Sequence, residues 1–309
     1  MAVAGKWLKW SLLEGGTKVA KRFTMAYAGL ASRSWDGAYT LSLLGGFIIL
    51  IGGFIGGRKN NANFWASPKV IMGGLVNGVI VTLITVLGAA AFIYPGADAG
   101  VITFFSTASI VPGALIDWKF FGRPLSLRQC LGIVVYFLAG MAILDFPSFK
   151  ELVNLPTWVL IAILLIFIQA TNEAVAQSVR KMDTFVINFW SGASTIIFSS
   201  IYLSFFGSWS FFANASYPFL AIAAITGLIT FGMTTFKLFA YKEHGSIALV
   251  KLVVQGTHLV GSVVLGMIIL NEVMSLGKVL GMFGFFLAFG MMDAGAWKTI
   301  QGLKSRIAA

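Results

Sequence analysis

Charge is scarce in this 309-residue chain, because Asp, Glu, Lys and Arg together make up only 11% of it. A soluble domain usually carries about 25% charged residues. Hydrophobic residues instead reach 58%, and the mean hydropathy is +0.88. These values exclude an ordinary water-soluble globular protein and predict an all-α integral membrane protein.

Cysteine and histidine are almost absent. Cys130 is the single cysteine, so an intramolecular disulfide is excluded. With two histidines the chain has no HExxH metal motif, and it has no GxxxxGK[ST] phosphate-binding loop. We therefore expect a protein without enzymatic activity, cofactor or metal, and ATP-driven transport has no support.

Long apolar stretches predict the number of membrane spans. A helix needs roughly 20 mostly apolar residues to cross the hydrocarbon core. Residues 1–30 form a weaker first candidate, since six charged side chains interrupt them. Counting this one, about ten transmembrane helices are expected, the other nine at 39–57, 70–94, 99–121, 129–146, 157–179, 185–206, 217–241, 246–270 and 278–296.

The distribution of Lys and Arg predicts the orientation. If both termini are cytoplasmic, the opposite side carries only Lys150 and Lys278 in its loops. Such an imbalance follows the positive-inside rule. The basic residues lie in short loops rather than in one patch between aromatic residues, which argues against a nucleic-acid partner. The cytoplasmic side would hold Arg58, Lys59, Lys69, Lys119, Arg123, Arg128, Arg180, Lys181, Lys242, Lys298, Lys304 and Arg306.

The chain contains an internal repeat. Ser126, Leu127, Leu131 and Gly132 recur 149 positions later as Ser275, Leu276, Leu280 and Gly281. Two copies of five spans each would be inserted with opposite orientation, as inverted repeats that suit alternating access. The predicted division is a first repeat at 1–146, a linker at 147–155, a second repeat at 156–297 and a cytoplasmic tail at 298–309.

Two segments carry a family resemblance. The stretches "STASIVPGALIDWKFFGRPLSLRQCLGIVVYFLAGMAIL" (106–144) and "KLVVQGTHLVGSVVLGMIILNEVMSLGKVLGMFGFFLAFG" (251–290) resemble the ends of EamA repeats in the drug/metabolite transporter (DMT) superfamily. The resemblance implies ten helices, cytoplasmic termini, and a central cavity lined chiefly by the third, fourth, eighth and ninth spans. It also suggests a bacterial inner membrane as the location.

Small and helix-breaking residues suggest packing and hinge positions. Glycines four residues apart, such as Gly74 and Gly78, allow helices to approach closely, within the chain or in a homodimer. Pro112 and Gly261 fall near the middle of equivalent spans and are candidate hinges. Glu272, in the loop before the tenth span, is expected to be a turn and capping residue for the next helix.

The ninth span carries a polar stripe. Lys251, Gln255, His258 and Ser262 are spaced by 4, 3 and 4 residues and therefore share one helical face. Ionisable groups in hydrocarbon are costly unless they face protein or water, so this face should point inward. His258 lies near mid-depth, where transporter sites occur. The alternatives are a buried structural histidine and a Lys251 that reaches the membrane surface.

Other candidate solute-binding residues come from neighbouring spans. Thr234 and Lys237 share a face of the eighth span, although Lys237 could also reach the cytoplasmic surface. Ser106 and Ser109 on the fourth span and Asn77 on the third are uncharged candidates. None of these residues alone indicates a solute site, since side-chain hydroxyls in helices often form hydrogen bonds to their own backbone.

Glu14 and Glu173 form an alternative constellation. "LLEGG" loosely resembles the setting of the first-helix glutamate of small multidrug-resistance proteins, which would imply proton and cation binding. The simpler interpretation is local pairing, Glu14 with Lys18 and Glu173 with nearby basic residues.

The leading hypothesis is a secondary transporter for a small polar metabolite, with an anion or zwitterion favoured if the Lys and His side chains face the cavity. One alternative is a proton-coupled exporter of cations that uses Glu14 or Glu173. Another is a non-transporting membrane scaffold. The expected partners are the solute, a coupling proton or counter-solute, and the lipid bilayer, with the chain as monomer or homodimer.

Overall fold

The computed structural model describes residues 5–65, 67–109, 112, 126–143, 155–179, 182–243 and 247–292. These residues form helices and loops, and no strand occurs among them. The predicted all-α class is confirmed for this part of the chain. The elements are α1 (Gly5–Ser32), α2 (Trp35–Lys59), α3 (Pro68–Ala90), η1 (Ala91–Ile93), α4 (Ala99–Thr107), α6 (Leu127–Ile143), α8 (Thr157–Val179), α9 (Thr184–Phe205), α10 (Ser210–Ala213), α11 (Tyr217–Lys242), α12 (Ile247–Ile269) and α13 (Leu276–Met292).

Side-chain caps set where many helices begin. The Asp183 carboxylate accepts hydrogen bonds from the backbone N–H groups of Phe185 and Val186 at 2.8 and 3.1 Å. These bonds satisfy donors that have no partner inside the helix. The same role is taken by Ser34 at α2, Ser67 at α3, Asp98 at α4 and Ser216 at α11. Polar residues in short loops thus end one helix and start the next.

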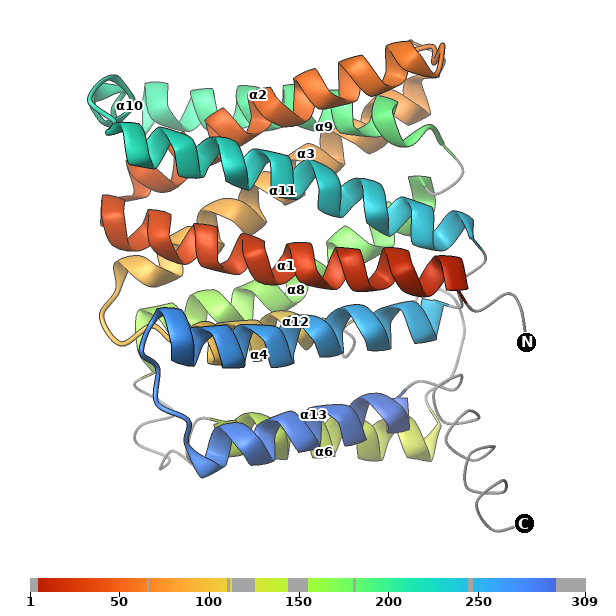
Figure 1. Cartoon of the computed structure of the whole chain (residues 1–309), viewed down its shortest axis with the longest axis vertical. Helices are drawn as coiled ribbons and strands as arrows, with labels where there is room; N and C mark the ends of the chain where they lie inside the picture. The colour runs from red at the N-terminus through yellow and green to blue at the C-terminus, as the bar shows by residue number, and fades with distance from the viewer. Residues whose placement is uncertain are drawn as a thin grey trace.

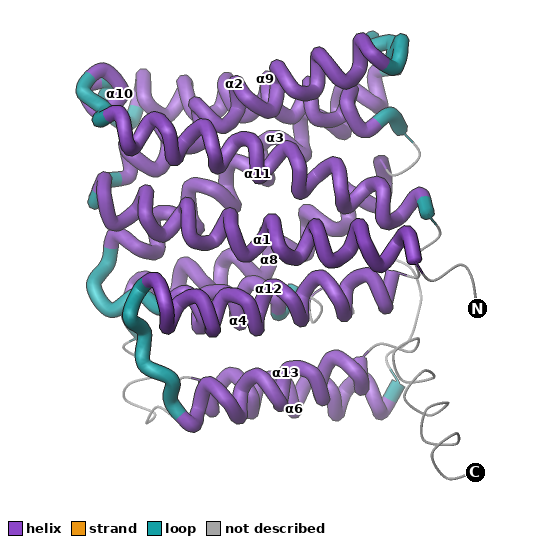
Figure 2. Tube along the Cα trace, in the orientation of Figure 1, coloured by secondary structure: helices purple, strands orange, loops and turns teal. Residues whose placement is uncertain are grey.

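The helices lie side by side and their connections gather at two ends (Figures 1 and 2). α2 packs on α9 and α6 on α13, while α1 lies between α11 and α12. α3 packs on α8 and α9, and α4 packs on α8 and α12. The pair α6 and α13 lies at the lower edge of the view in Figure 1. We call the end with Arg58, Lys59 and Lys69 the inner end, and the end with Asp98 and Lys278 the outer end.

Five helices are long and apolar enough to cross a membrane: Trp35–Lys59, Pro68–Ile93, Thr157–Ala176, Thr184–Phe205 and Tyr217–Ala240. Shorter apolar helices cover Leu127–Ile143, Val253–Ile269 and Leu276–Ala288. Exposed large side chains on the outside, such as Phe47, Phe137 and Leu228, fit a surface that faces lipid. The structure is therefore compatible with an integral membrane protein.

Glycines bring helices into backbone contact. A Cβ on Gly53 of α2 would lie 2.4 Å from the backbone nitrogen of Phe189 in α9. One on Gly78 of α3 would lie 2.3 Å from the carbonyl oxygen of Ser191, also in α9. No side chain fits at either place. These glycines therefore serve packing within the chain, as one of the two interpretations of their spacing predicted.

The ambiguous first 30 residues form the 28-residue helix α1. Its polar residues Ser11, Glu14, Lys21 and Arg22 are all buried. α1 is charged yet enclosed because its polar face meets protein on α11 and α12 rather than lipid. This arrangement places three basic side chains of α1 in the middle of the molecule.

Candidate functional site

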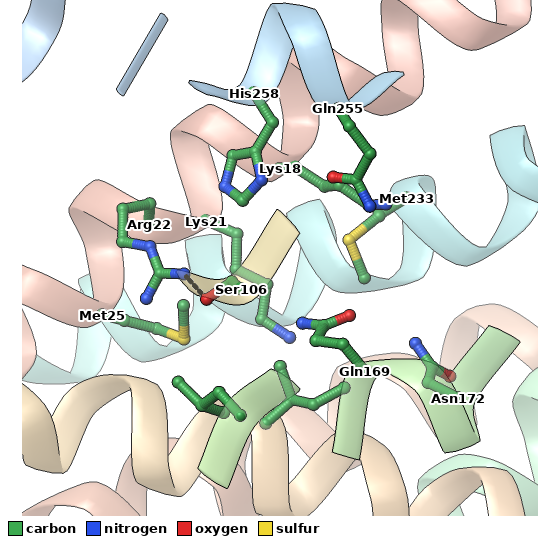
Figure 3. A pocket seen from close by; sticks show the side chains of 12 residues that line it. Lys18, Lys21, Arg22, Met25, Ser106, Gln169, Asn172, Met233, Gln255 and His258 are labelled. Atoms are coloured by element: carbon green, nitrogen blue, oxygen red, sulfur yellow. Dashed lines mark hydrogen bonds between the residues drawn. The ribbon is translucent and has the colours of Figure 1, made fainter. Parts of the chain in front are cut away.

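A chamber lies among six helices, α1, α3, α4, α8, α11 and α12. About 520 Å³ within its outline is free of protein atoms, open solvent included, and the centre of a water molecule can occupy about 30 Å³ of this space. Figure 3 shows side chains pointing into it from α1, α8 and α12. Its lining consists of Lys18, Lys21, Arg22, Met25, Ile84, Ser106, Leu165, Gln169, Asn172, Met233, Gln255 and His258.

Helix α1 supplies the cations of the chamber. Lys18, Lys21, Arg22 and Met25 follow each other at intervals of three, one and three residues, which places them on one helical face. Lys21 lies 16 residues after Gly5, so it is about 24 Å along the helix. In a helix of 28 residues, that is near the middle. Lys21 and Arg22 are each only 3% exposed.

The Arg22 guanidinium is held on one side. Its Nη2 donates to the Ser106 hydroxyl at 2.8 Å (Figure 3). Its Nε donates to the Thr103 hydroxyl at 3.1 Å. Ser106 in turn donates to the carbonyl oxygen of Ile102 at 2.7 Å. The remaining nitrogen, Nη1, has no hydrogen-bond partner. The guanidinium is thus oriented by α4 and keeps unused donor capacity.

Lys21 is buried, and its Nζ has no hydrogen-bond partner in the part of the chain that the structure describes. Among the described residues, neither Lys21 nor Arg22 pairs with a carboxylate. The acid nearest in sequence, Glu14, pairs with Lys18 instead, at 3.0 Å. Burying a cation without a counter-charge costs several kcal/mol. The chamber therefore holds positive charge that the described protein groups leave uncompensated.

Helices α8 and α12 supply further polar side chains to the chamber. Gln169 and Asn172 come from α8, and Gln255 and His258 come from α12 (Figure 3). Carboxamides both donate and accept hydrogen bonds, so they suit hydroxyl, amide or carbonyl groups of a ligand. The chamber thus combines cationic side chains of α1 with hydrogen-bonding side chains of α8 and α12.

A second pocket adjoins the first and shares Asn172 and Met233 with it. It encloses about 360 Å³ of unfilled space. Its other residues come from the first half and the middle of α3, the first half of α9 and the second half of α8 and α11, hence mainly from the inner half of the molecule. They are Asn77, Val81, Ala176, Val179, Ile187, Thr234, Lys237 and Leu238.

The structure divides the nine predicted solute-binding residues into three groups. His258, Gln255 and Ser106 line the chamber, and Thr234, Lys237 and Asn77 line the second pocket. The Asn77 amide also donates to the Ser191 hydroxyl at 3.0 Å. Ser109 and Ser262 are buried but line neither pocket. The side chain of Lys251 lies outside the described part of the structure.

The alternative proton site and the predicted hinges have different surroundings. Glu14 forms the local pair with Lys18, while the side chain of Glu173 is not described. A Cβ on Gly261 would lie 2.7 Å from Cγ2 of Val19, so this glycine also permits close packing of α12 on α1. Pro112 is helical, and the residues around it lie outside the description.

The sequence-based reasoning missed Lys18, Lys21 and Arg22, and also Gln169 and Asn172. The resemblance implied a cavity lined by the third, fourth, eighth and ninth spans, but the first and sixth, α1 and α8, also contribute. The usable signal was the spacing of the three cations on one face of a helix rich in small residues. By hydropathy alone, the same charges only weaken the case for a membrane span.

Comparisons with known proteins support the fold alone. No family model and no curated protein matches the chain. Among solved structures, one described only as "Crystal structure of protein" aligns over 94% of this chain and 98% of its own, with a TM-score of 0.60 and 18% identity. The fold therefore occurs in at least one other protein of about the same length, and the likeness carries no information on activity.

Proposed function

We propose that this protein is a secondary transporter of a small anionic solute, which binds in the chamber between Lys21 and Arg22 and the carboxamides of α8. The observation that carries the proposal is the pair of buried cations without a counter-charge among the described residues. An anion in the chamber would supply the missing charge and accept hydrogen bonds from Lys21 Nζ and Arg22 Nη1.

The packing of the helices supports two equivalent halves. α1 packs on α11 and α12, and their counterparts under a five-span repeat show the same relation, since α8 packs on α3 and α4. Likewise α2 packs on α11 and α9 packs on α3. Three further pairs, α2 with α9, α4 with α12 and α6 with α13, join corresponding helices. This pattern favours ten spans in two inverted repeats, as in the EamA-type transporters that the sequence resembles.

Alternating access follows from this proposal. The second pocket continues from the chamber toward the inner end, where the positive-inside rule places the cytoplasm. The arrangement fits a solute path that leads inward, with the outer end closed. Both termini would then be cytoplasmic, and a bacterial inner membrane is the proposed location.

Two other functions have less support. A proton-coupled cation exporter would need a carboxylate available to a cation, but Glu14 already pairs with Lys18 at 3.0 Å. A membrane scaffold would have no use for Lys21 and Arg22 in a chamber, because apolar residues there would be cheaper to bury. The charge of the chamber is therefore the feature that separates the three functions.

Thermal unfolding of the purified full-length protein, with a panel of solutes added, tests the proposal. Inorganic phosphate, phosphate esters and organic acids are expected to raise the melting temperature, since a ligand that binds only the folded state stabilises it. Uncharged and cationic analogues of similar size should have no effect. Stabilisation by cationic compounds instead of anions would contradict the proposal and revive the exporter.

A further inference from the structure

An ion cluster closes the outer end of the molecule. Glu272, in the loop between α12 and α13, accepts a hydrogen bond at Oε1 from the backbone N–H of Ala99 at 2.6 Å. Its Oε2 lies 3.8 Å from Lys278 Nζ. Lys278 also bonds the carboxylate of Asp98, and Asp98 caps α4 through the Val101 N–H at 2.9 Å. We call Asp98, Glu272 and Lys278 the outer cluster.

The loop that carries Glu272 is built to bring it to α4. Asn271 has a positive φ of 54°, which turns the chain sharply after α12. The Glu272 backbone N–H then donates back to the carbonyl oxygen of Gly266 at 3.2 Å. A Cβ on Gly266 would lie 2.4 Å from Glu272 Oε2, so glycine leaves the space that the carboxylate fills.

The outer cluster joins the two halves of the chain. Glu272 caps α4 in the first half, not the following helix α13, which is capped by Ser275 through the Lys278 N–H at 3.2 Å. The two residues joined by the Glu272–Ala99 bond are 173 positions apart. Opening the outer end by separating α4 from α12 and α13 must break these contacts.

Charge within the outer cluster is unbalanced. Two carboxylates face one ammonium group among the described residues, with α12 contributing only Gly266 at this point. The Glu272 side chain is 9% exposed, and its Oε2 has no hydrogen-bond partner. Burial above all, and then the nearby Asp98, raise the pKa of Glu272 to about 7 from an ordinary value of 4.5, although the Ala99 N–H and Lys278 act in the opposite direction.

We propose that Glu272 is a proton-binding site of the transport cycle, which takes up a proton when the outer end closes and releases it when the outer end opens to water. The inference rests on the proposed function, since it needs two states of the outer end. In the closed state a proton on Oε2 removes the excess negative charge. It also turns this buried oxygen into a hydrogen-bond donor. In the open state water solvates the carboxylate, and the proton leaves.

The direction of the pH dependence follows from linkage. A carboxyl whose pKa is higher in the closed state binds more protons there, so closing is favoured as the pH falls. Protonation does not stabilise the closed state well above a pH of about 7. The stabilisation grows as the pH falls from about 7 to 4.5 and is complete below 4.5. Between pH 8 and pH 5.5, one proton would shift the open–closed equilibrium by about 30-fold at most.

Cysteine labelling of the full-length protein, without any solute, tests this site. Ala99→Cys in a Cys130→Ser background places a thiol directly behind Glu272, because Ala99 is fully buried in the closed state. The rate at which this thiol reacts with a maleimide is divided by the rate for the exposed Cys130 of the wild type at the same pH. This normalised rate measures how often the outer end opens. The normalised rate is expected to rise by about 10- to 30-fold from pH 5.5 to pH 8.

Adding Glu272→Gln should abolish this response and keep the rate low at both pH values, because the carboxamide keeps an acceptor for Ala99 and adds a donor. The matched control Glu243→Gln, at an exposed residue at the inner end of α11, should leave the response intact. A normalised rate that is independent of pH, or a response that survives Glu272→Gln, would overturn the inference. Since no solute is present, failure here is distinct from failure to bind anions.

Discussion

At the scale of single residues, the buried cations of α1 are only partly satisfied by the described residues. Arg22 donates two hydrogen bonds, to Thr103 and Ser106 of α4, while its Nη1 has no partner among the described residues. Lys21 keeps its whole ammonium group without a partner. Such groups are expensive to bury without a partner, and this cost is the basis of the proposed anion site.

Ser106 is expected to be a positioning residue for Arg22. Ser106→Ala removes the acceptor of the Arg22 Nη2 bond at 2.8 Å, so the guanidinium loses part of its orientation. We expect the affinity for a stabilising anion to fall by about 3- to 10-fold, the worth of roughly one hydrogen bond. Titration of the melting temperature against the anion measures it.

The controls for Ser106 separate orientation from packing. Ser106→Thr keeps the hydroxyl and should restore the affinity. Ser109→Ala, also buried but outside the chamber, should leave the affinity unchanged. An equal loss in the Ser109 and Ser106 alanine variants would show that Ser106 has no particular role toward Arg22.

Site prediction from the sequence succeeded at residues whose polarity stands out in an apolar helix. The 4, 3 and 4 spacing in α12 led to His258 and Gln255, which line the chamber. The sequence did not lead to Lys21 and Arg22. Charged residues near the N-terminus lower the hydropathy of a helix in the same way whether it is enclosed by protein or solvated. Only the packing of α1 between α11 and α12 distinguishes the two cases.

At the scale of helices, apolar length and capping residues predicted most elements well. The candidate spans at 39–57 and 185–206 correspond to α2 and α9, which begin slightly earlier because Ser34 and Asp183 cap them. The expected capping role of Glu272 holds, but the helix was wrong. The local pattern favours α13, whereas a contact across 173 residues, invisible in the sequence, directs the carboxylate to α4.

Gly261 has two proposed roles, as a hinge and as a packing residue, and one substitution distinguishes them. In Gly261→Ala the new methyl group would lie 2.7 Å from Val19 Cγ2, tighter than van der Waals contact. If packing dominates, the free energy of unfolding should fall by about 1–3 kcal/mol, the usual cost of overpacking. Thermal unfolding in detergent measures it.

Gly16→Ala on the neighbouring α1 is the control for Gly261, since nothing lies within 4 Å of its Cβ position. It should leave stability unchanged or slightly raise it, as alanine favours a helix over glycine. Unchanged stability of Gly261→Ala together with slower transport would instead support the hinge.

At the scale of the whole molecule, the two ends of the helix array differ. The second pocket, which shares Asn172 and Met233 with the chamber, lies toward the inner end, and Asp98, Glu272 and Lys278 form an ion cluster at the outer end. The internal repeat in the sequence predicts two halves, and the packing of α2 on α9, of α4 on α12 and of α6 on α13 is compatible with that prediction. The sequence could not indicate which end is closed, because closure depends on contacts between the halves.

Under the proposed function, the sign of the solute's charge is the property of the whole molecule that is most informative to measure. Counterflow in proteoliposomes, with the anion that most raises the melting temperature, should be fast for the wild type and reduced by at least about 100-fold in Lys21→Gln combined with Arg22→Gln, since each charge-assisted contact contributes about 1.4 kcal/mol or more. Lys9→Gln, on the exposed face of the same helix, should transport normally. Undiminished counterflow of the anion in the double variant would contradict the proposed role of the chamber.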